Sequence, residues 1–383
     1  LSWINYYTYF MAEITLLADM AVAFVVSAVI AGIFIPQILL IAFRKQLFDV
    51  PDERKIHTSA VPRLGGIAFM LVTVFAVMLV IGANLTIGES LICVDIVNEV
   101  LQFCFGFCAL ILIYVVGIAD DLIGVRYRAK FIVQTLSALL IVASGLYIDD
   151  MHGLMYLHSL PPIVGYVLTL VVIVFITNSI NLIDGIDGLA SGLCMVALLY
   201  YTLVFYTFGH YTYALLSAAL LGTVVPFFYY NVFGSAAKHK KIFMRDTGAL
   251  TLGMLISTLS LRTNLFNNGG QVNNAFVMAF APLIVPCFDV IRVYIHRIRT
   301  GKSPFLPDKN HIHHKLMRCG LTPRLAMISI ISLSVAVTAA NLVASFVISL
   351  NALIVADLVL YFAGHGVLNK IIARRNRKSA LAN

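Results

Sequence analysis

Charged residues are scarce in this chain of 383 residues: Asp, Glu, Lys and Arg together make up 11% of the sequence, while hydrophobic residues make up 61%. Soluble globular proteins contain roughly 25% charged residues, so the composition excludes that class. The mean hydropathy of +0.95 instead indicates a protein that crosses a membrane several times.

Several other signals are missing. None of the six cysteines forms a CxxC pair, so we expect neither a thiolate metal site nor disulfides. Residues 1–19 have no basic segment and no small-residue cleavage site, so we expect no cleaved signal peptide. Linkers, low-complexity stretches and clear internal repeats are also absent. We therefore expect residues 1–383 to form a single transmembrane domain.

Long apolar runs recur along the chain. A helix needs about 20 apolar residues to cross ~30 Å of hydrocarbon, and about eleven windows satisfy this requirement. These windows centre on residues 20–43, 65–83, 100–119, 131–148, 163–181, 189–208, 212–233, 247–266, 275–296, 325–349 and 352–368. The window at 247–266 is the weakest, because Ser, Thr and Arg262 dilute its second half. The sequence thus predicts an all-α, polytopic membrane bundle.

Basic residues gather on one side of this bundle. If the N-terminus lies outside, the inside loops and flanking helix ends carry every Lys and Arg except Arg262. Those loops lie near residues 44–63, 120–130, 181–188, 234–246 and 297–324, together with the tail from Lys370. This asymmetry follows the positive-inside rule and predicts a cytoplasmic C-terminus. The net charge of +8 then faces anionic headgroups and phosphorylated substrates rather than nucleic acid.

Two adjacent acids, Asp120 and Asp121, end one apolar run. An unpaired carboxylate near hydrocarbon costs on the order of 3 kcal/mol, so such groups are usually paired, metal-bound or functional. Neighbouring residues on a helix point about 100° apart, so we expect divided roles, one acid facing the reaction centre and the other a cation or a basic neighbour. The alternative is a solvated pair at a helix C-terminus, which the helix dipole disfavours.

A second acidic stretch, Asn181-x-x-Asp184-Gly-x-Asp187-Gly, follows another apolar run. If the segment stays helical, its three polar residues line one face, and the glycines let a ligand or helix approach it. Hard oxygen donors of this kind suit Mg²⁺ or Mn²⁺, with substrate phosphates completing the shell. A polar hairpin between spans is the alternative.

Three further loops carry candidate residues. The glycine pair Gly65-Gly66 would let backbone amides approach a phosphate, although the basic residues before it also fit a simple membrane anchor. Asp246 begins a span, where an N-cap is the alternative to a metal ligand. The stretch His-Ile-His-His at 311–314 lacks zinc-site spacing, so its imidazoles favour contacts to phosphate or sugar oxygens.

From about residue 45 to 320 the chain resembles the polyprenyl-phosphate N-acetylhexosamine-1-phosphate transferases, most of all their bacterial undecaprenyl-phosphate GlcNAc-1-phosphate branch. Five segments carry the resemblance in the family order: Asp49…Pro62-Arg63-Leu-Gly65-Gly66, Asp120-Asp121 with Lys130, Asn181-x-x-Asp184-Gly-x-Asp187-Gly, Phe243-x-x-Asp246-x-Gly248, and His311-Ile-His313-His314. The branch that transfers phospho-MurNAc-pentapeptide typically has three consecutive histidines instead. Arg245 and Ala249 depart from the family, which usually has Gly and often has Ser there.

The resemblance implies a role for each matching residue. Asp246 and Asn181 would hold Mg²⁺ or Mn²⁺, and Asp120 would act as the base or electrostatic partner of the lipid phosphate. The rest of the centre would be ordered by Asp121, Asp184 and Lys130. The nucleotide would be bound by Phe243, Asp187 and Asn231. The sugar and its phosphate would be bound by nearby basic residues together with His311, His313, His314, Arg63 and Asp49.

The resemblance also implies transfer of GlcNAc-1-phosphate from UDP-GlcNAc to undecaprenyl phosphate at the inner face of a bacterial plasma membrane. This reaction releases UMP and begins the membrane stage of cell-envelope polysaccharide synthesis. The catalytic loops would be those at about 44–65, 119–130, 177–191, 231–248 and 297–324, and the enzyme would be a homodimer. The alternatives are another donor such as UDP-MurNAc-pentapeptide, an ion-coupled secondary transporter, and a non-catalytic lipid-binding scaffold.

Overall fold

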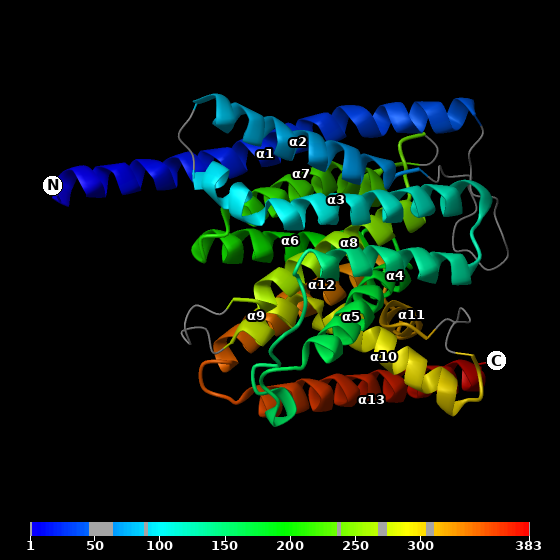
Figure 1. Cartoon of the computed structure of the whole chain (residues 1–383). Helices are drawn as coiled ribbons and strands as arrows, with labels where there is room; N and C mark the ends of the chain where they lie inside the picture. Colours follow the sequence, from blue (N-terminus) through cyan, green and yellow to red (C-terminus); the bar gives the residue numbers. More distant parts are fainter. Residues whose placement is uncertain are drawn as a thin grey trace.

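The computed structural model describes residues 2–45, 64–87, 91–235, 239–266, 274–303 and 310–382. The predicted sugar- and phosphate-binding residues Asp49 and Arg63 lie outside these ranges. Within them the chain is a bundle of helices without a β-strand, which confirms the predicted fold class. Figure 1 shows the long helices running roughly along one direction, with the N-terminus at one end of the bundle and the C-terminus at the other.

The helices follow the predicted apolar windows. In chain order they are α1 (Ser2–Arg44), α2 (Ile67–Ile87), α3 (Leu91–Ile123), α4 (Tyr127–Ala143), η1 (Leu154–Tyr156), α5 (Pro162–Ile183), α6 (Leu189–Thr207), α7 (Tyr211–Phe233), α8 (Arg245–Asn264), α9 (Ala275–Phe280), η3 (Ala281–Leu283), α10 (Ile284–Arg299), α11 (Ile312–Arg318), α12 (Pro323–Ala344) and α13 (Leu350–Ala382).

Nine segments in the described part of the chain are long and apolar enough to cross a membrane. The helices α4 and α8 fall outside that group, so the predicted number of about eleven spans stays a prediction. The window at 275–296 is broken into α9, η3 and α10, and Pro282 stands in the middle of this break. Proline lacks the amide that would continue the helical hydrogen bonds, which accounts for the interruption.

The weakly apolar helix α8 lies at the centre of the bundle, where it packs against α3, α5 and α6. Glycines make these close crossings possible. A Cβ atom added at Gly253 would lie 2.7 Å from the Cα of Thr177 in α5, and one added at Gly117 in α3 would lie 2.6 Å from the Cα of Thr247. Small residues at crossings are typical of membrane helices, because lipid supplies no hydrophobic drive for helix association.

Arg262, the basic residue that departs from the one-sided charge pattern, lies in the last turn of α8. Its guanidinium donates to Glu99 Oε1 at 2.8 Å and lies 2.8 Å from Nδ1 of His210. Asp95, Glu99 and His210 bring potential metal-ligand atoms within 4.8 Å of one another. Because the guanidinium already supplies a cation there, we interpret this cluster as a compensated ion pair that closes the far end of the bundle.

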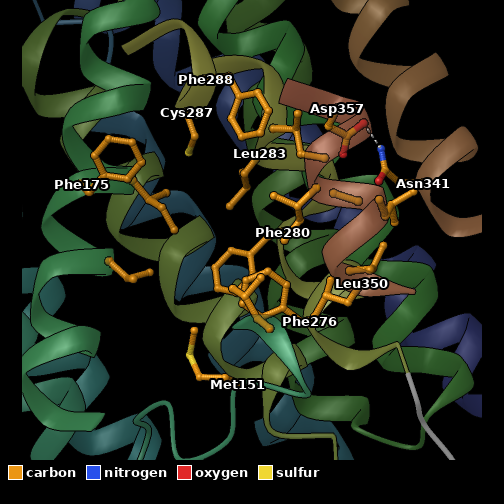
Figure 2. Close-up of a pocket in the computed structure, with 18 of the residues that line it drawn as sticks. Met151, Phe175, Phe276, Phe280, Leu283, Cys287, Phe288, Asn341, Leu350 and Asp357 are labelled. Carbon is orange, nitrogen blue, oxygen red and sulfur yellow. Dashed lines mark hydrogen bonds between the residues drawn. The ribbon is translucent and has the colours of Figure 1, made fainter. Parts of the chain in front are cut away.

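The last helix, α13, contacts the bundle at its start, near its middle, where the Tyr361 hydroxyl donates to Asp289 Oδ1 at 3.2 Å, and further on at Asn369. At its start, Asn351 accepts a hydrogen bond from Met155 N and donates to Gly153 O. Between the ends, an apolar cavity of about 350 Å³ separates α13 from α5 and α10. Figure 2 shows this cavity, with Asp357 of α13 hydrogen-bonded to Asn341 of α12 at its edge.

Candidate active site

The end of α3 and the start of α4 hold a lysine between two carboxylates. Lys130 Nζ lies 2.7 Å from Asp120 Oδ2 and 3.2 Å from Asp246 Oδ1. The other oxygen of Asp120 accepts a 2.6 Å hydrogen bond from the backbone amide of Val125, in the turn between the helices. This turn therefore fixes Asp120 and the lysine together, as expected for a residue pair that orders a reaction centre.

Asp121 has different contacts from its neighbour: Asp120 has the basic partner, whereas Asp121 faces the start of α8. Its carboxylate is 4% exposed and accepts hydrogen bonds from the backbone amides of Asp246 and Thr247, both at 3.0 Å. The hydroxyl of Thr247 donates a third bond at 2.5 Å. These donors belong to the first turn of α8, where a negative charge also complements the helix dipole. Asp121 therefore anchors the N-terminus of the helix that carries Asp246.

Asp246 lies in the first turn of α8, whose N-cap residue is Met244. The alternative role of Asp246 as a simple N-cap is therefore wrong, and its carboxylate accepts bonds from side chains instead. The preceding residue, Arg245, has a φ of 56°, a left-handed conformation that favours glycine. This conformation gives a physical reason for the glycine that the family usually has at this position.

The break between α5 and α6 supplies a third side of the site. Asn181, in the last turn of α5, donates a 3.0 Å hydrogen bond from Nδ2 to Asp246 Oδ1. The helix ends at Ile183, so the condition for placing Asn181, Asp184 and Asp187 on one helical face is not met. The chain instead turns at Gly188, whose φ is 79°.

Asp184 is partly buried at the end of α5. Desolvation, followed by the negative charges of nearby aspartates, raises the pKa of this carboxyl to about 7, although the positive charge of Arg245 opposes the rise. Besides burial, neighbouring carboxylates thus disfavour the ionised form of Asp184. A carboxylate cluster of this kind favours binding of an additional cation.

The segment before α8 is tied to the same break. Lys241 Nζ lies 2.5 Å from Asp187 Oδ2, so this acid has a basic partner far away in the sequence. The buried amide of Asn231 accepts a 2.6 Å bond from Gly188 N and donates a 2.7 Å bond to Ile242 O. These contacts position Phe243, the predicted nucleotide contact, between a fixed neighbour and α8, while Asn231 acts here as a brace of the loop.

Gly65 and Gly66 pack closely against the segment that leads into α8. A Cβ added at Gly65 would lie 2.3 Å from the carbonyl oxygen of Phe243, and one added at Gly66 would lie 2.0 Å from the amide nitrogen of Gly248. The pair is therefore packed against the backbone that enters α8. Its glycines allow this close approach of two chain segments.

The histidine segment reaches the site through His313. This imidazole is 1% exposed, and a Cβ added at Gly185 would lie 2.2 Å from its Nε2. The contact joins the histidine motif to the acidic α5–α6 break. Desolvation, together with the nearby His314 and His311, lowers the pKa of His313 to about 3, so it is neutral at pH 7.

His311 is oriented by a residue that sequence reasoning missed. Its Nδ1 lies 2.8 Å from Oδ2 of Asp289, a fully buried acid in α10. Asp289 also accepts bonds from the Ile312 amide at 3.0 Å and from Arg292 at 2.8 Å. A lone acid inside an apolar window was the available signal, since such residues are usually paired and functional.

The donor set of this site fits a divalent metal ion. Asp246, Asp184 and Asn181 offer hard oxygen atoms, which Mg²⁺ and Mn²⁺ prefer. Asp187 and Asp246 both raise the pKa of Asp184 by their negative charge, which a cation bound beside these acids would offset. Asp187 has Lys241 as its own partner, whereas Asp120 and Asp246 share the single charge of Lys130. The residues next to Asp246 are therefore the ones that fit a metal.

Comparison with known proteins agrees with this geometry. Residues 103–264, which include the candidate site from Asp120 to Asp246, match the model of glycosyl transferase family 4. The helical membrane fold and this match define the class of the protein as an integral membrane sugar-phosphate transferase.

Curated relatives specify the family. A Bacillus subtilis protein named probable undecaprenyl-phosphate N-acetylglucosaminyl 1-phosphate transferase is 33% identical over 311 residues, covering 81% of this chain and 80% of its own. Two further relatives are named undecaprenyl-phosphate alpha-N-acetylglucosaminyl 1-phosphate transferase. The protein of Yersinia pestis is 29% identical over 76% of this chain and 74% of its own. The protein of Escherichia coli K12 is 28% identical over 80% of this chain and 80% of its own. The chain therefore belongs to the polyprenyl-phosphate N-acetylhexosamine-1-phosphate transferase family.

Proposed function

We propose that this enzyme transfers GlcNAc-1-phosphate from UDP-GlcNAc to undecaprenyl phosphate and releases UMP. The observation that carries the proposal is the junction at Asp246, where Lys130 of α4 and Asn181 of α5 both contact one carboxylate oxygen of α8. Such a junction of carboxylates and one lysine suits the handling of phosphate groups. The names of the relatives and the His-Ile-His-His segment support the choice of donor and acceptor.

The reaction would proceed by direct attack of the lipid phosphate. One of its oxygen atoms forms a bond to the sugar-bearing phosphorus, the bond from that phosphorus to the bridging oxygen breaks, and the electron pair leaves with UMP. Asp120 would orient the acceptor phosphate or take its proton, and Lys130 would balance the charge between Asp120 and Asp246. A phosphomonoester is already an anionic nucleophile, so an aspartyl intermediate is not required.

The remaining residues would bind the donor. Asp246 and Asn181, with Asp184 beside them, would hold Mg²⁺ or Mn²⁺, which when bound offsets negative charge on the transferred phosphoryl group. Asp187 and Phe243 would contact the nucleotide from the loop that Asn231 braces. The neutral imidazole of His313 suits hydrogen bonds with sugar oxygens, and we assign the sugar side of the donor to the histidine segment.

The charge pattern supports an orientation in the membrane. The candidate site lies at the end of the bundle that carries the basic loops, so we place it on the cytoplasmic side with the N-terminus outside. The acids lie at helix ends on this one side, whereas a transporter usually places such groups near the bilayer midplane. The same placement supports an enzyme over an ion-coupled carrier. A homodimer is part of the proposal on family grounds alone.

UMP release by the purified protein in detergent tests the proposal. With undecaprenyl phosphate, UDP-GlcNAc and Mg²⁺ we expect release that stops when the lipid is omitted or the metal is chelated. Release with another UDP-sugar alone would contradict the donor, and release without the lipid would contradict the acceptor.

Two variants test the assignment of the active site. Asp246→Ala should abolish metal-dependent turnover, while a scaffold would be indifferent to it. Asp149→Asn is the matched control, because Asp149 is an exposed carboxylate in the loop between α4 and η1. Equal loss of turnover in both variants would contradict the assignment of the site.

A further inference from the structure

A second polar cavity lies at the basic end of the bundle, between α10, α11 and α13. Its volume is about 330 Å³, and basic side chains from two of these helices line it: Arg292 and His296 of α10, and Lys315 and Arg318 of α11. Asparagines and two aliphatic residues complete the lining, and none of the described lining residues is Asp or Glu. A cavity with several cations and no acid in its wall is suited to an anion.

This cavity and the candidate active site lie against different faces of α11. His313 contacts Gly185 of the acidic loop. Lys315 lies about 200° further around the helix, at about 100° per residue, and donates a 2.9 Å hydrogen bond to Asn369 of α13. Arg318 donates to Asn310 Oδ1 at 3.3 Å. The basic residues near the histidines therefore point away from the site to which the sequence assigned them.

The cations crowd one another. Burial, followed by repulsion from Arg292 and Arg318, lowers the pKa of Lys315 to about 8. Arg292 does have a partner, since it donates to Asp289 Oδ1 at 2.8 Å. That acid, however, is fully buried and belongs to the network of His311 rather than to the cavity wall. A negatively charged group in the cavity would relieve this repulsion.

The location of the cavity favours a membrane lipid as the source of that group. One wall is α13, whose span is long and apolar enough to cross a membrane and ends at Arg377. The exposed residues Lys370, Arg374 and Arg377 mark the end of this helix that would meet the bilayer surface. Basic clusters next to a membrane helix attract anionic lipids by about 1 kcal/mol for each cation.

We infer that the cavity between α10, α11 and α13 binds the phosphate group of an anionic phospholipid from the adjoining leaflet. Bound there, the headgroup joins α11 to α13 through Lys315 and Asn369. It also contacts Arg292, which donates to the carbonyl oxygen of Asn310, the residue that precedes His311. The lipid therefore stabilises the helix that brings His313 to the acidic loop, without itself contacting that loop.

Native mass spectrometry of the full-length protein with phosphatidylglycerol and phosphatidylcholine tests this inference without requiring turnover. We expect retention of phosphatidylglycerol in preference to phosphatidylcholine. The variant Lys315→Gln/Arg318→Gln should weaken retention about 30-fold, which corresponds to about 2 kcal/mol at 1.4 kcal/mol per factor of ten. The matched control Arg374→Gln/Arg377→Gln removes the same charge from exposed positions outside the cavity, and it should weaken retention clearly less than the cavity variant.

Two further arms complete the test. Asn369→Leu keeps every cation but replaces a polar wall residue with a bulkier apolar one, so it should also lose the lipid even if the double variant folds poorly. Inorganic phosphate at millimolar concentration should not displace phosphatidylglycerol. Displacement by phosphate would overturn the lipid assignment, and equal retention by the wild type and both cavity variants would overturn the site itself.

Discussion

The contacts of Asp121 give the sharpest test of how the candidate site is assembled. Asp121 presents both carboxylate oxygens to three donors in the first turn of α8, the amides of Asp246 and Thr247 and the Thr247 hydroxyl. Asp121→Asn conserves the shape of the side chain but replaces one acceptor with an NH₂ group. That group would face hydrogen-bond donors, and the negative charge at the N-terminus of the helix would be lost.

The size of the effect follows from these two losses. A hydrogen bond to a charged group contributes about 1.5–3 kcal/mol, and an anion at a partly buried helix N-terminus contributes about 0.3–2 kcal/mol. We therefore expect Asp121→Asn to lower the free energy of unfolding by about 3 kcal/mol. Because Asp121 holds the backbone amide of Asp246, the variant should also bind Mg²⁺ more weakly and turn over more slowly.

Thermal unfolding in detergent, with and without Mg²⁺, measures the first effect, and UMP release over a Mg²⁺ titration measures the second. The control is Asp120→Asn, which changes the adjacent acid but leaves the N-terminus of α8 anchored. It should lower turnover with a smaller loss of Tm, since Asp120 contacts Lys130 and the Val125 amide. If Asp121→Asn had the Tm and Mg²⁺ requirement of the wild type, the anchoring role would be refuted.

Three other perturbations test the electrostatics of the site. The pKa of Asp184 is raised from 3.8 to about 7, so between these values the folded state holds a proton that the unfolded state has released. In the presence of chelator, Tm should therefore fall as the pH is raised from 5 to 8, and Asp184→Asn should remove this dependence of Tm on pH. Arg245→Gly should raise the free energy of unfolding by about 1 kcal/mol, because glycine adopts the positive φ without strain, and an unchanged Tm would contradict this strain. The same variant should lower turnover at pH 7, because loss of the arginine charge raises the pKa of Asp184. Asp289→Asn leaves Arg292 buried without its carboxylate partner, so it should destabilise the protein by about 3 kcal/mol or more, which calorimetry measures. It should also raise the KM for the donor, because His311 loses the carboxylate oxygen that orients it, and a donor titration measures this effect.

The membrane helices could be predicted because a bilayer imposes a strong one-dimensional requirement. Each apolar window corresponds to a helix in the structure, since about 20 apolar residues must satisfy their backbone hydrogen bonds internally. Even the doubtful window at 247–266 corresponds to α8, because a central helix need not be apolar towards lipid. The break at Pro282 and the short helix α11 were not predicted, since neither involves a change in the length of an apolar run.

The acidic motifs identified the region of the site but not the contacts within it. The partners Asp121 and Thr247 are separated by 126 positions in the sequence, and Asp187 and Lys241 by 54. Hydropathy and residue spacing carry no information about such pairs. No Lys or Arg stands close to Asp187 along the chain, whereas the fold brings Lys241 within hydrogen-bonding distance of it.

Arg245 shows what a motif alone leaves unexplained. The family resemblance identifies it as a departure, but it does not say whether the missing glycine matters for a ligand or for the backbone. The φ of 56° answers that question in favour of the backbone, because only glycine adopts this conformation without strain. The arginine also adds a positive charge that lowers the pKa of Asp184, so the same substitution that strains α8 helps to keep this carboxylate ionised. A family member with glycine at this position lacks the positive charge that Arg245 places near Asp184. In a cluster of this composition, a bound metal ion is the natural source of such a charge.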